Sequence, residues 1–388
     1  LTFIEKEFYV INYGDKKNGI IHTSIQNYQL INEMKNIKLF DPVVEKKEIE
    51  KTIQTLKSGV WASGNGSGQV YEFETKFKQF INSKACVAVN SGTAALHLAA
   101  SLCNIQGKEV ILPSLSFVST AHAIIYNGGI PVFADIDPNT LCISLEDVKK
   151  KISKKTKCII PVHFGGMPVD VRKLKRLRSN LMIIEDAAHA CGSELNGKMI
   201  GCHGDFVCFS FHPIKNLAML TGGLIAINHP KYKKMALDLK SKRWCGISSR
   251  VGTDYDVDKI GWNFYMNEIS ATIGLSQLEK LKKMNNKRKK IAKIYEKELG
   301  ISRKIPLVKN CVYHLYWICV KNRNIFRKKL QEQGIETGTH YKPIHNLSYY
   351  HKKSVKLPVT EKISKEIVTI PIHPNLSGTD IDKIIATV

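Results

Sequence analysis

The stretch ACVAVNSGTAALHLAASLCNIQGKEVILPS (residues 85–114) decides the fold class of this chain. It contains two short apolar runs, ACVAVNS and EVILPS, which are separated by a segment with helix-like spacing at 92–103. A strand, a helix and a second strand in this order are typical of a parallel β-α-β unit. Because both runs are apolar on both faces, they fit a sheet that helices cover on both sides.

Five more apolar, β-branched runs follow this unit: IPVFADI (130–136), KCIIPVHF (157–164), LMIIEDA (181–187), DFVCFSF (205–211) and GLIAIN (223–228). Segments with helix-like spacing separate most of them, at 117–127, 144–152 and 169–178. We therefore predict an α/β fold whose large domain has three layers around a mostly parallel seven-stranded sheet. The last two runs lie only 11 residues apart, which is short for a helical crossover. We expect one of them to run antiparallel, or the connection to be irregular.

The pattern changes after residue 230 from short strands to longer helical segments. Residues 266–298 predict one long helix, because apolar side chains recur there with a period of about 3.6. Further along, the sequence predicts one strand and three helices, at 311–320, 326–334, 361–368 and 380–388. We expect three parts: an N-terminal arm (1–38), a large α/β domain (39–250) and a smaller C-terminal α+β domain (251–388) that the long helix enters.

The composition excludes several classes of protein. Apolar residues make up 43% of the 388 residues, so disorder as the main state is excluded. No apolar run approaches the roughly 18 residues of a membrane span. The first residues, LTFIEKEFYVINYGDKK, contain acids and no continuous apolar segment, so we expect no secretory signal. We predict a cytoplasmic protein without a membrane partner.

The cysteines and histidines do not form a recognisable metal-binding pattern. None of the ten Cys has C-x-x-C spacing, and most lie in apolar runs, which indicates buried thiols in a reducing compartment. One group of residues contains possible metal ligands: His189, Cys191, Cys202, His203, Cys208 and His212. Its spacing matches no compact zinc pattern, so we predict no metal site.

The chain is strongly basic, with 58 Lys and Arg against 34 Asp and Glu and a net charge of +24. The densest runs, 149–157 and 285–290, are not interleaved with aromatic residues as a single-strand nucleic-acid platform would be. We interpret them as solvated helix faces and expect no nucleic-acid partner. Nucleic-acid binding remains an alternative that predicts retention on DNA with a steep salt dependence. A phosphorylated substrate would also benefit from the positive field.

Three strand ends carry residues with chemical potential, since active sites of open α/β sheets lie at the carboxyl ends of strands. After the first strand, Ser91-Gly92-Thr93 opens a helix whose backbone N–H groups suit an anion. Asp186 ends a later apolar strand, where its partner is either a core cation or a protonated ring nitrogen. Lys215 follows the next strand, where desolvation would lower its pKa and free the amine as a nucleophile. An anion site, an acid and a lysine are the parts that hold pyridoxal 5′-phosphate (PLP).

The order of motifs resembles the DegT/StrS family of PLP-dependent nucleotide-sugar aminotransferases, within the fold-type-I aspartate aminotransferase superfamily. The resemblance runs from about residue 39 to the end. It rests on SGVWASG (58–64), VNSGTAALHLA (89–99), ILPSLSFVSTAHAI (111–124), GGIPVFADIDPNT (128–140), IIEDAAHACGS (183–193), FSFHPIKN (209–216), GWNFYMNEISATIGLSQL (261–278), GIETGTHYKPIH (334–345) and LPVTEKISKEIVTIPIHP (357–374).

The resemblance implies a role for each matching residue. Lys215 would bind the cofactor covalently and then shuttle the proton, while Asp186 would keep the pyridine nitrogen protonated. The other implied cofactor contacts are Gly92, Thr93 and Ser210 at the phosphate, Phe117 on the ring face, His189 near the 3′-oxygen, and Asn263 at the phosphate of the partner subunit's cofactor. The implied substrate-side residues are Trp61, His340, Tyr341 and His345. A shared site of this kind implies a homodimer.

The resemblance also implies the reaction and its alternatives. An amino acid, by resemblance L-glutamate, would donate its amino group to a keto group of a nucleotide-activated keto-deoxy sugar, for surface-glycan synthesis. The chain departs from the family pattern at two places: Ala218-Met219-Leu220-Thr221-Gly222-Gly223 stands where many members read T-T-G-E-G-G, and Tyr265 stands where many members have Arg. The alternatives are a sugar dehydratase of the same family, which would have His in place of Lys215, and a non-catalytic regulatory relative.

Overall fold

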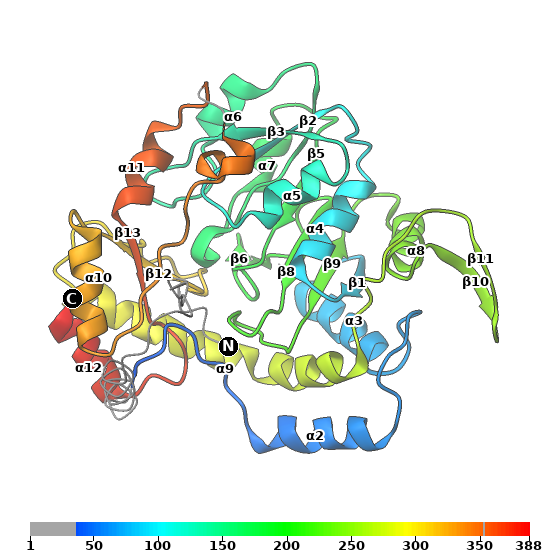
Figure 1. The fold of residues 1–388 in the computed structure, drawn as a ribbon, viewed down its shortest axis with the longest axis horizontal. Helices are drawn as coiled ribbons and strands as arrows, with labels where there is room; N and C mark the ends of the chain where they lie inside the picture. The colour runs from blue at the N-terminus through cyan, green and yellow to red at the C-terminus, as the bar shows by residue number, and fades with distance from the viewer. Residues whose placement is uncertain (1–35, 352–353) are drawn as a thin grey trace, which may run out of the picture.

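The structure is a computed structural model that describes residues 36–351 and 354–388. The greater part of the expected N-terminal arm, residues 1–35, therefore lies outside the described residues. The core is a seven-stranded sheet with the order β1-β9-β8-β5-β4-β2-β3 (Figure 1). Its strands are β1 (Ala85–Val89), β2 (Glu109–Pro113), β3 (Ile130–Ala134), β4 (Thr156–Ile159), β5 (Met182–Asp186), β8 (Phe206–Ser210) and β9 (Gly223–Ile227).

All seven predicted strands are confirmed, and so is the expected change of direction. Strands β3, β2, β4, β5 and β8 pair in parallel. Strand β9 runs antiparallel to both of its neighbours, β8 and β1. The short connection between β8 and β9 cannot hold a crossover helix, which is why the chain reverses there.

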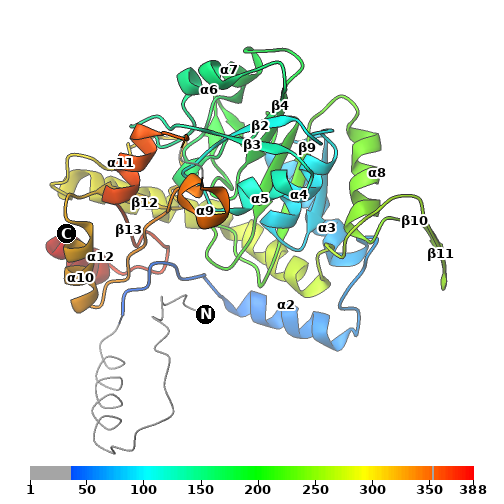
Figure 2. The ribbon, with the colours of Figure 1, turned by 45° about the horizontal axis from the view of Figure 1, so that its top comes forward.

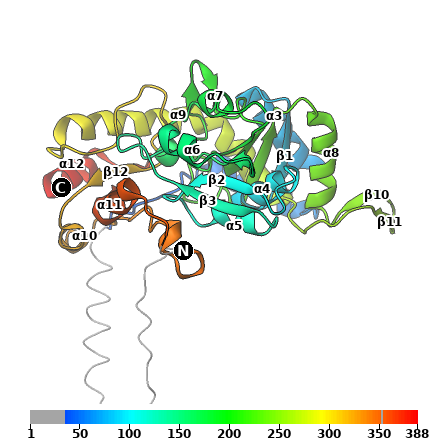
Figure 3. The ribbon, with the colours of Figure 1, turned by 90° about the horizontal axis from the view of Figure 1, so that it is seen from above.

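Helices cover both faces of the sheet, as the two-sided apolar runs predicted (Figure 3). On one face lie α4 (Gly92–Ser101), α5 (Ser119–Ile125) and α8 (Tyr232–Arg243), which pack on alternate strand residues such as Val87 and Val89. On the other face α3 (Gly68–Ile81) and α9 (Glu268–Glu298) pack on the intervening residues, including Ala88. Two shorter helices, α6 (Leu145–Lys151) and α7 (Val171–Lys175), complete this second face.

Helix α9 connects the large sheet to the C-terminal elements (Figure 1). It lies within the range that the sequence predicted, and helix α2 (Lys46–Lys57) runs alongside it. The C-terminal elements gather at the far end of α9 (Figure 2). They are β12 (Tyr316–Cys319), α10 (Arg323–Glu332), α11 (Pro358–Glu366), β13 (Ile367–Ile370) and α12 (Gly378–Thr387), with short 3₁₀ turns at Ile344–Asn346 and Ser348–Tyr350.

Two of the C-terminal predictions are wrong at their edges. The strand predicted at 311–320 is shorter, because Tyr313 has a φ of 47° and turns the backbone before β12 begins. The helix predicted at 361–368 ends at Glu366, and Ile367 and Val368 instead pair with β12 as the start of β13.

Three small elements lie outside these layers. Strands β6 (Glu194–Leu195) and β7 (Lys198–Met199) form a short hairpin. Strands β10 (Ile247–Val251) and β11 (Asp254–Val257) form a hairpin that extends beyond α8, away from the body of the molecule (Figure 3). In the described part of the chain, no helix has the length and apolarity needed to cross a bilayer.

Candidate active site

Lys215 lies just beyond the carboxyl end of β8, in a turn that its own backbone closes. Its N–H donates to the carbonyl of His212 at 2.8 Å. Burial lowers the pKa of the Lys215 amine from 10.5 to about 8, and the Asp186 carboxylate partly opposes this shift. The amine forms no hydrogen bond with any described residue, so it is free to react.

Asp186 ends β5, the strand next to β8, and is buried. Its Oδ2 accepts a hydrogen bond from Thr120 Oγ1 at 2.8 Å, and its Oδ1 accepts one from the Ala188 N–H at 3.2 Å. Burial raises the pKa of this carboxyl, whereas the two hydrogen bonds and the charge of Lys215 lower it. The two charged groups that the sequence singled out therefore lie in the same neighbourhood, where each affects the other electrostatically.

The start of α4 forms an open cradle beside these residues. Ser91 caps the helix by accepting the Ala94 N–H, which leaves the N–H groups of Gly92 and Thr93 without an acceptor among the described residues. A Cβ on Gly92 would lie 2.7 Å from the Cβ of Ser210, so only glycine lets α4 approach β8 this closely. Two free N–H groups and the Ser210 hydroxyl thus face one small space at a helix N-terminus, which suits a phosphate.

A group of rings lies beside the lysine. His189 accepts a hydrogen bond at Nδ1 from the Gly165 N–H (3.3 Å), so its Nε2 carries the proton and donates to Tyr341 Oη at 3.1 Å. Burial, and then the charge of Lys215, lower the pKa of His189 well below its usual value, which keeps the ring neutral. Phe117 is 58% exposed, and its ring lies 6.1 Å from that of Tyr341.

The remaining predicted residues lie at different distances from this group. His340 bonds Thr369 Oγ1 through Nδ1 at 2.8 Å, and its ring is 4.9 Å from Tyr341. His345 is held by Ser114 at 2.7 Å, and no contact among the described residues joins it to the ring group. Trp61 and Asn263 are both exposed and lie on loops; Trp61 donates to the Leu56 carbonyl.

Sequence reasoning missed four residues of the neighbourhood: Thr120, His314, Asn216 and His163. Thr120 lies one turn after Phe117 inside a quoted motif, but nothing in the sequence showed that its hydroxyl meets Asp186. His314 lies 4.4 Å from the His189 ring although it is 125 residues further along the chain, counting from residue 189 to residue 314. Only the tertiary fold brings such residues together.

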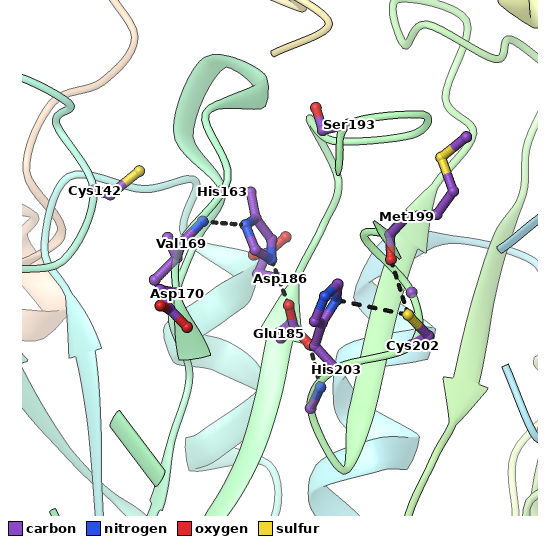
Figure 4. Close-up of polar contacts among 12 residues, drawn as sticks. Cys142, His163, Val169, Asp170, Glu185, Asp186, Ser193, Met199, Cys202 and His203 are labelled. Carbon is purple, nitrogen blue, oxygen red and sulfur yellow. Dashed lines mark hydrogen bonds and ion pairs between the residues drawn. The ribbon is translucent and has the colours of Figure 1, made fainter. Parts of the chain in front are cut away.

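His163 and Glu185 form a buried pair next to the backbone of Asp186 (Figure 4). His163 Nε2 lies 2.8 Å from Glu185 Oε2, and both side chains are fully buried. The Val169 N–H donates to His163 Nδ1, so the imidazole proton is on Nε2 and points to the carboxylate. The backbone N–H of His163 donates to the Asp186 carbonyl at 3.1 Å. This pair therefore fixes the backbone that carries Asp186.

The possible metal ligands between His189 and His212 do not form one cluster in the described part of the chain. Cys202 bonds the Met199 carbonyl and lies 3.9 Å from His203 Nδ1 (Figure 4). Within residues 36–351 and 354–388, no three His, Cys, Asp or Glu side chains are grouped as a metal site requires.

The sheet, the lysine after β8, the acid at the end of β5 and the cradle at α4 together define the fold-type-I class of PLP-dependent transaminases. The chain belongs to the DegT/DnrJ/EryC1/StrS aminotransferase family, whose model matches residues 42–388.

Named relatives and solved structures agree with this assignment. GDP-perosamine synthase of Escherichia coli O157:H7 is 33% identical over 357 residues, which cover 90% of this chain and 96% of the relative. The spore coat polysaccharide biosynthesis protein SpsC of Bacillus subtilis is 35% identical over 374 residues, covering 89% and 95%. PseC of Helicobacter pylori, an aminotransferase involved in pseudoaminic acid biosynthesis, superimposes with a TM-score of 0.85 at 27% identity, covering 91% and 98%. A sugar aminotransferase of Streptococcus pneumoniae solved in its PLP form has a TM-score of 0.85 at 28% identity, covering 91% and 97%.

The described residues fit the cofactor. Gly92 brings the start of α4 close to Ser210, and the N–H groups of Gly92 and Thr93 have no acceptor among the described residues. The buried carboxyl of Asp186 has no cationic hydrogen-bond partner among these residues, and a protonated ring nitrogen would supply one. The free Lys215 amine has the lowered pKa of a carbonyl-binding nucleophile.

Proposed function

We propose that this chain transfers the amino group of an amino acid, L-glutamate, to a keto group of a nucleotide-activated keto-deoxy sugar. The observation that carries the proposal is the neighbourhood of Lys215 and Asp186 beside the cradle of Gly92 and Ser210. Relatives named for GDP-perosamine synthesis and for spore coat polysaccharide biosynthesis support a nucleotide-linked sugar substrate. We favour a 4-keto sugar, made for surface glycans.

Each residue of the site has a part in this reaction. When bound, PLP supplies an electron sink that makes a proton on the substrate carbon removable. Asp186 would hold the ring nitrogen in its protonated form, and Thr120 orients the Asp186 carboxylate. Lys215 would hold the cofactor, and its amine would move a proton at the substrate carbon. The N–H groups of Gly92 and Thr93, with Ser210, would bind the phosphate, and Phe117 would contact the ring.

Lys215 also decides between the branches of the family. A dehydratase of the family has His at this position, because its base must not tie up the cofactor. Here a half-buried lysine with a lowered pKa stands at this position, which supports transamination. A non-catalytic regulatory relative would not need the pair of Lys215 and Asp186, and this chain retains both.

The proposed enzyme is a homodimer whose subunits share each site. Phe117 and Asn263 are exposed in the single chain, although both are assigned to the cofactor. Helix α2 also exposes Ile49, Ile53 and Leu56, at 53%, 45% and 45%, on one face. A second copy would cover these apolar side chains and bring Asn263 to the partner's phosphate. The cysteines of the described residues are all free thiols, which fits the proposed cytoplasmic location.

Absorbance spectroscopy tests the proposal directly. The purified protein should show the visible band of lysine-bound PLP, and Lys215→Ala should abolish it. L-glutamate should shift the band to that of the amine form and release 2-oxoglutarate. A nucleotide-linked 4-keto sugar should then restore the original band, whereas the nucleotide alone should not. A colourless wild type that takes up no added PLP would defeat the proposal.

A further inference from the structure

His314 is fixed between two rings close to the proposed site. Its side chain is 1% exposed, and its backbone N–H donates to the Gly165 carbonyl at 2.9 Å. The imidazole lies 4.4 Å from the ring of His189 and stacks on Phe40 at 5.6 Å, with 17° between the planes. The proposed function above assigns it no role.

The hydrogen bonds of Asn216 determine which nitrogen of His314 carries the proton. Asn216 Nδ2 donates to Asn285 Oδ1 at 2.9 Å and to the Val312 carbonyl at 3.3 Å. The amide oxygen of Asn216 therefore faces His314 Nδ1, 3.2 Å away. Because that oxygen can only accept, Nδ1 must carry the proton. The lone pair is then on Nε2, which is buried and has no partner among the described residues.

Two other buried nitrogens in this region also lack partners among the described residues. His373 uses Nε2 to donate to the Lys38 carbonyl at 2.9 Å, so its Nδ1 carries a lone pair that no described residue meets. Arg288 donates from Nη1 to the Ile372 carbonyl at 3.0 Å, and its Nε–H has no acceptor among the same residues. These contacts place the three groups in one region, because Ile372 and His373 are adjacent and Lys38 lies two residues before Phe40, which stacks on His314. The charge of Arg288 also contributes to lowering the pKa of both imidazoles, after burial and other groups.

The three atoms without a hydrogen-bond partner among the described residues are two acceptors, His314 Nε2 and His373 Nδ1, and one donor, the Arg288 Nε–H. A group that bonds all three must offer two donors and one acceptor. A water molecule offers two O–H donors for the imidazole lone pairs and an oxygen lone pair for the Arg288 Nε–H. An anion would offer no donor to the two imidazoles. A cation would offer no acceptor to Arg288 and would be repelled by it.

We propose that His314 is a positioning residue for Lys215, and that ordered water joins its Nε2 to Arg288 and His373. The inference rests on the proposed function. Helix α9 would then hold Asn216, the neighbour of Lys215, in two ways. Asn285 bonds it directly, and Arg288 acts through the water and His314. Asn285 and Arg288 are three residues apart on α9 and so face the same side.

Two substitutions of His314 distinguish its hydrogen bond to Asn216 from its proposed bond to water. His314→Asn keeps a donor where Nδ1 lies but removes the acceptor at Nε2, whereas His314→Phe removes both. We expect His314→Phe to lower kcat about tenfold or more with little change in KM, because a displaced lysine reacts slowly. The pH midpoint of the visible cofactor band should shift as well. His314→Asn should restore both values to within about threefold of the wild type.

The control is His97→Phe, because His97 is also a buried histidine, and its two ring nitrogens have no hydrogen-bond partner in the described part of the chain. We expect it to leave kcat and the pH midpoint unchanged. If His314→Phe does not fold, His314→Gln takes its place, since it keeps an acceptor but loses the donor to Asn216. The positioning role would be overturned if the variant that lacks the donor to Asn216 kept the wild-type kcat and pH midpoint. It would also be overturned if that variant and His314→Asn lost activity equally.

A crystal structure of the wild-type protein at a resolution that shows water tests the proposed water bridge between His314, Arg288 and His373. We expect a water within hydrogen-bond distance of His314 Nε2 and Arg288 Nε; a dry contact there overturns the bridge. Nitrogen NMR of the histidines should show the Nδ1–H form for His314, and the Nε2–H form would overturn the network. Both measurements are independent of turnover. A wild type that binds no PLP would therefore defeat the proposed function and leave the network open to these tests.

Discussion

The hydroxyl of Thr120 donates a hydrogen bond to Asp186 Oδ2 over 2.8 Å, across two elements that lie 66 residues apart in the chain. Burial alone would favour the protonated form of this carboxyl, since it raises the pKa. The Thr120 bond lowers that pKa and so helps to keep the carboxylate ionised. An ionised Asp186 is what a protonated ring nitrogen needs as its partner.

Replacing Thr120 by Val should weaken cofactor binding. A hydrogen bond to a charged group contributes about 1.5–3 kcal/mol, so we expect the Kd for PLP to rise about ten- to a hundredfold. The loss should grow as the pH falls, because the pKa of Asp186 would be higher in the variant. Fluorescence titration with PLP at several pH values measures this. Thr120→Ser keeps the hydroxyl and should bind as the wild type does; equal Kd values for Val and Ser would refute the role.

The amine of Lys215 should make the cofactor-free protein less stable near neutral pH. The pKa of Lys215 is about 8 in the folded chain and 10.5 in the unfolded chain. Between these two pH values the unfolded chain therefore binds more protons than the folded chain. Stability therefore rises as the pH increases through that window, and below it the buried charge costs free energy. We expect Lys215→Met to stabilise the cofactor-free protein by about 1–2 kcal/mol at pH 7, since partial solvent contact reduces the full effect.

Urea unfolding of Lys215→Met and wild type at pH 7 and pH 10 checks this expectation. The stability difference should shrink toward the higher pH, where the wild-type amine is mostly neutral. Lys154→Met changes an exposed lysine and should leave the unfolding free energy nearly unchanged at both values. A difference that increases with pH would show that the sign is wrong.

His189 should tolerate Gln far better than Leu. The Nε2–H of His189 donates to Tyr341, and a Gln amide can place an N–H near the same point. We expect His189→Gln to keep the Kd for PLP within about threefold, while His189→Leu, which leaves the Gly165 N–H without its acceptor, should lose about tenfold or more. Tyr341→Phe should show a smaller loss than His189→Leu. Equal binding by Gln and Leu variants would exclude a hydrogen-bonding role.

The sheet was predictable because its signal is local. Each strand is a short apolar run between helical segments. The short gap after β8 predicted an antiparallel strand or an irregular connection, and β9 is antiparallel. The strand ends, and with them Asp186 and Lys215, could be placed because parallel strands share one functional edge. A predicted boundary was wrong where a single backbone angle decides it: Tyr313 turns the backbone, so the strand starts later than predicted.

The supporting residues were not predictable for a different reason. Thr120, His163 and His314 act through atoms that reach other elements, and nothing in their own surroundings in the sequence marks the partner. Residue type alone would mislead, since histidines without a functional role also occur in protein cores. His97 is buried, and neither of its ring nitrogens has a hydrogen bond within the described residues. Only the observed distances distinguish His314 from His97.

Gly92 should not accept a methyl group. A Cβ there would lie 2.7 Å from the Cβ of Ser210, in a place where backbone and strand cannot easily move apart. We expect Gly92→Ala to push α4 from β8, to lower stability by about 1–3 kcal/mol and to weaken PLP binding. Gly300→Ala is the matched control, because a Cβ there meets nothing within 4 Å. Differential scanning calorimetry and PLP titration report the two effects; a Gly92→Ala protein indistinguishable from Gly300→Ala would contradict the close packing.

The buried pair of His163 and Glu185, next to Asp186, should contribute to the free energy of unfolding. Glu185 accepts hydrogen bonds from His163 Nε2 and from the Gly204 N–H, so removing the imidazole leaves a buried carboxylate with one donor fewer (Figure 4). We expect His163→Leu to cost about 3–5 kcal/mol, because breaking one partner of a fully buried pair strands the other. Glu185→Gln should cost less, since the amide oxygen still accepts from one of the two donors. The double variant His163→Leu/Glu185→Leu should recover part of the loss, as an apolar pair of this kind strands no charge. Chemical denaturation of the wild type, His163→Leu, Glu185→Leu and the double variant measures the coupling, and strictly additive free energies would show that the two side chains act independently.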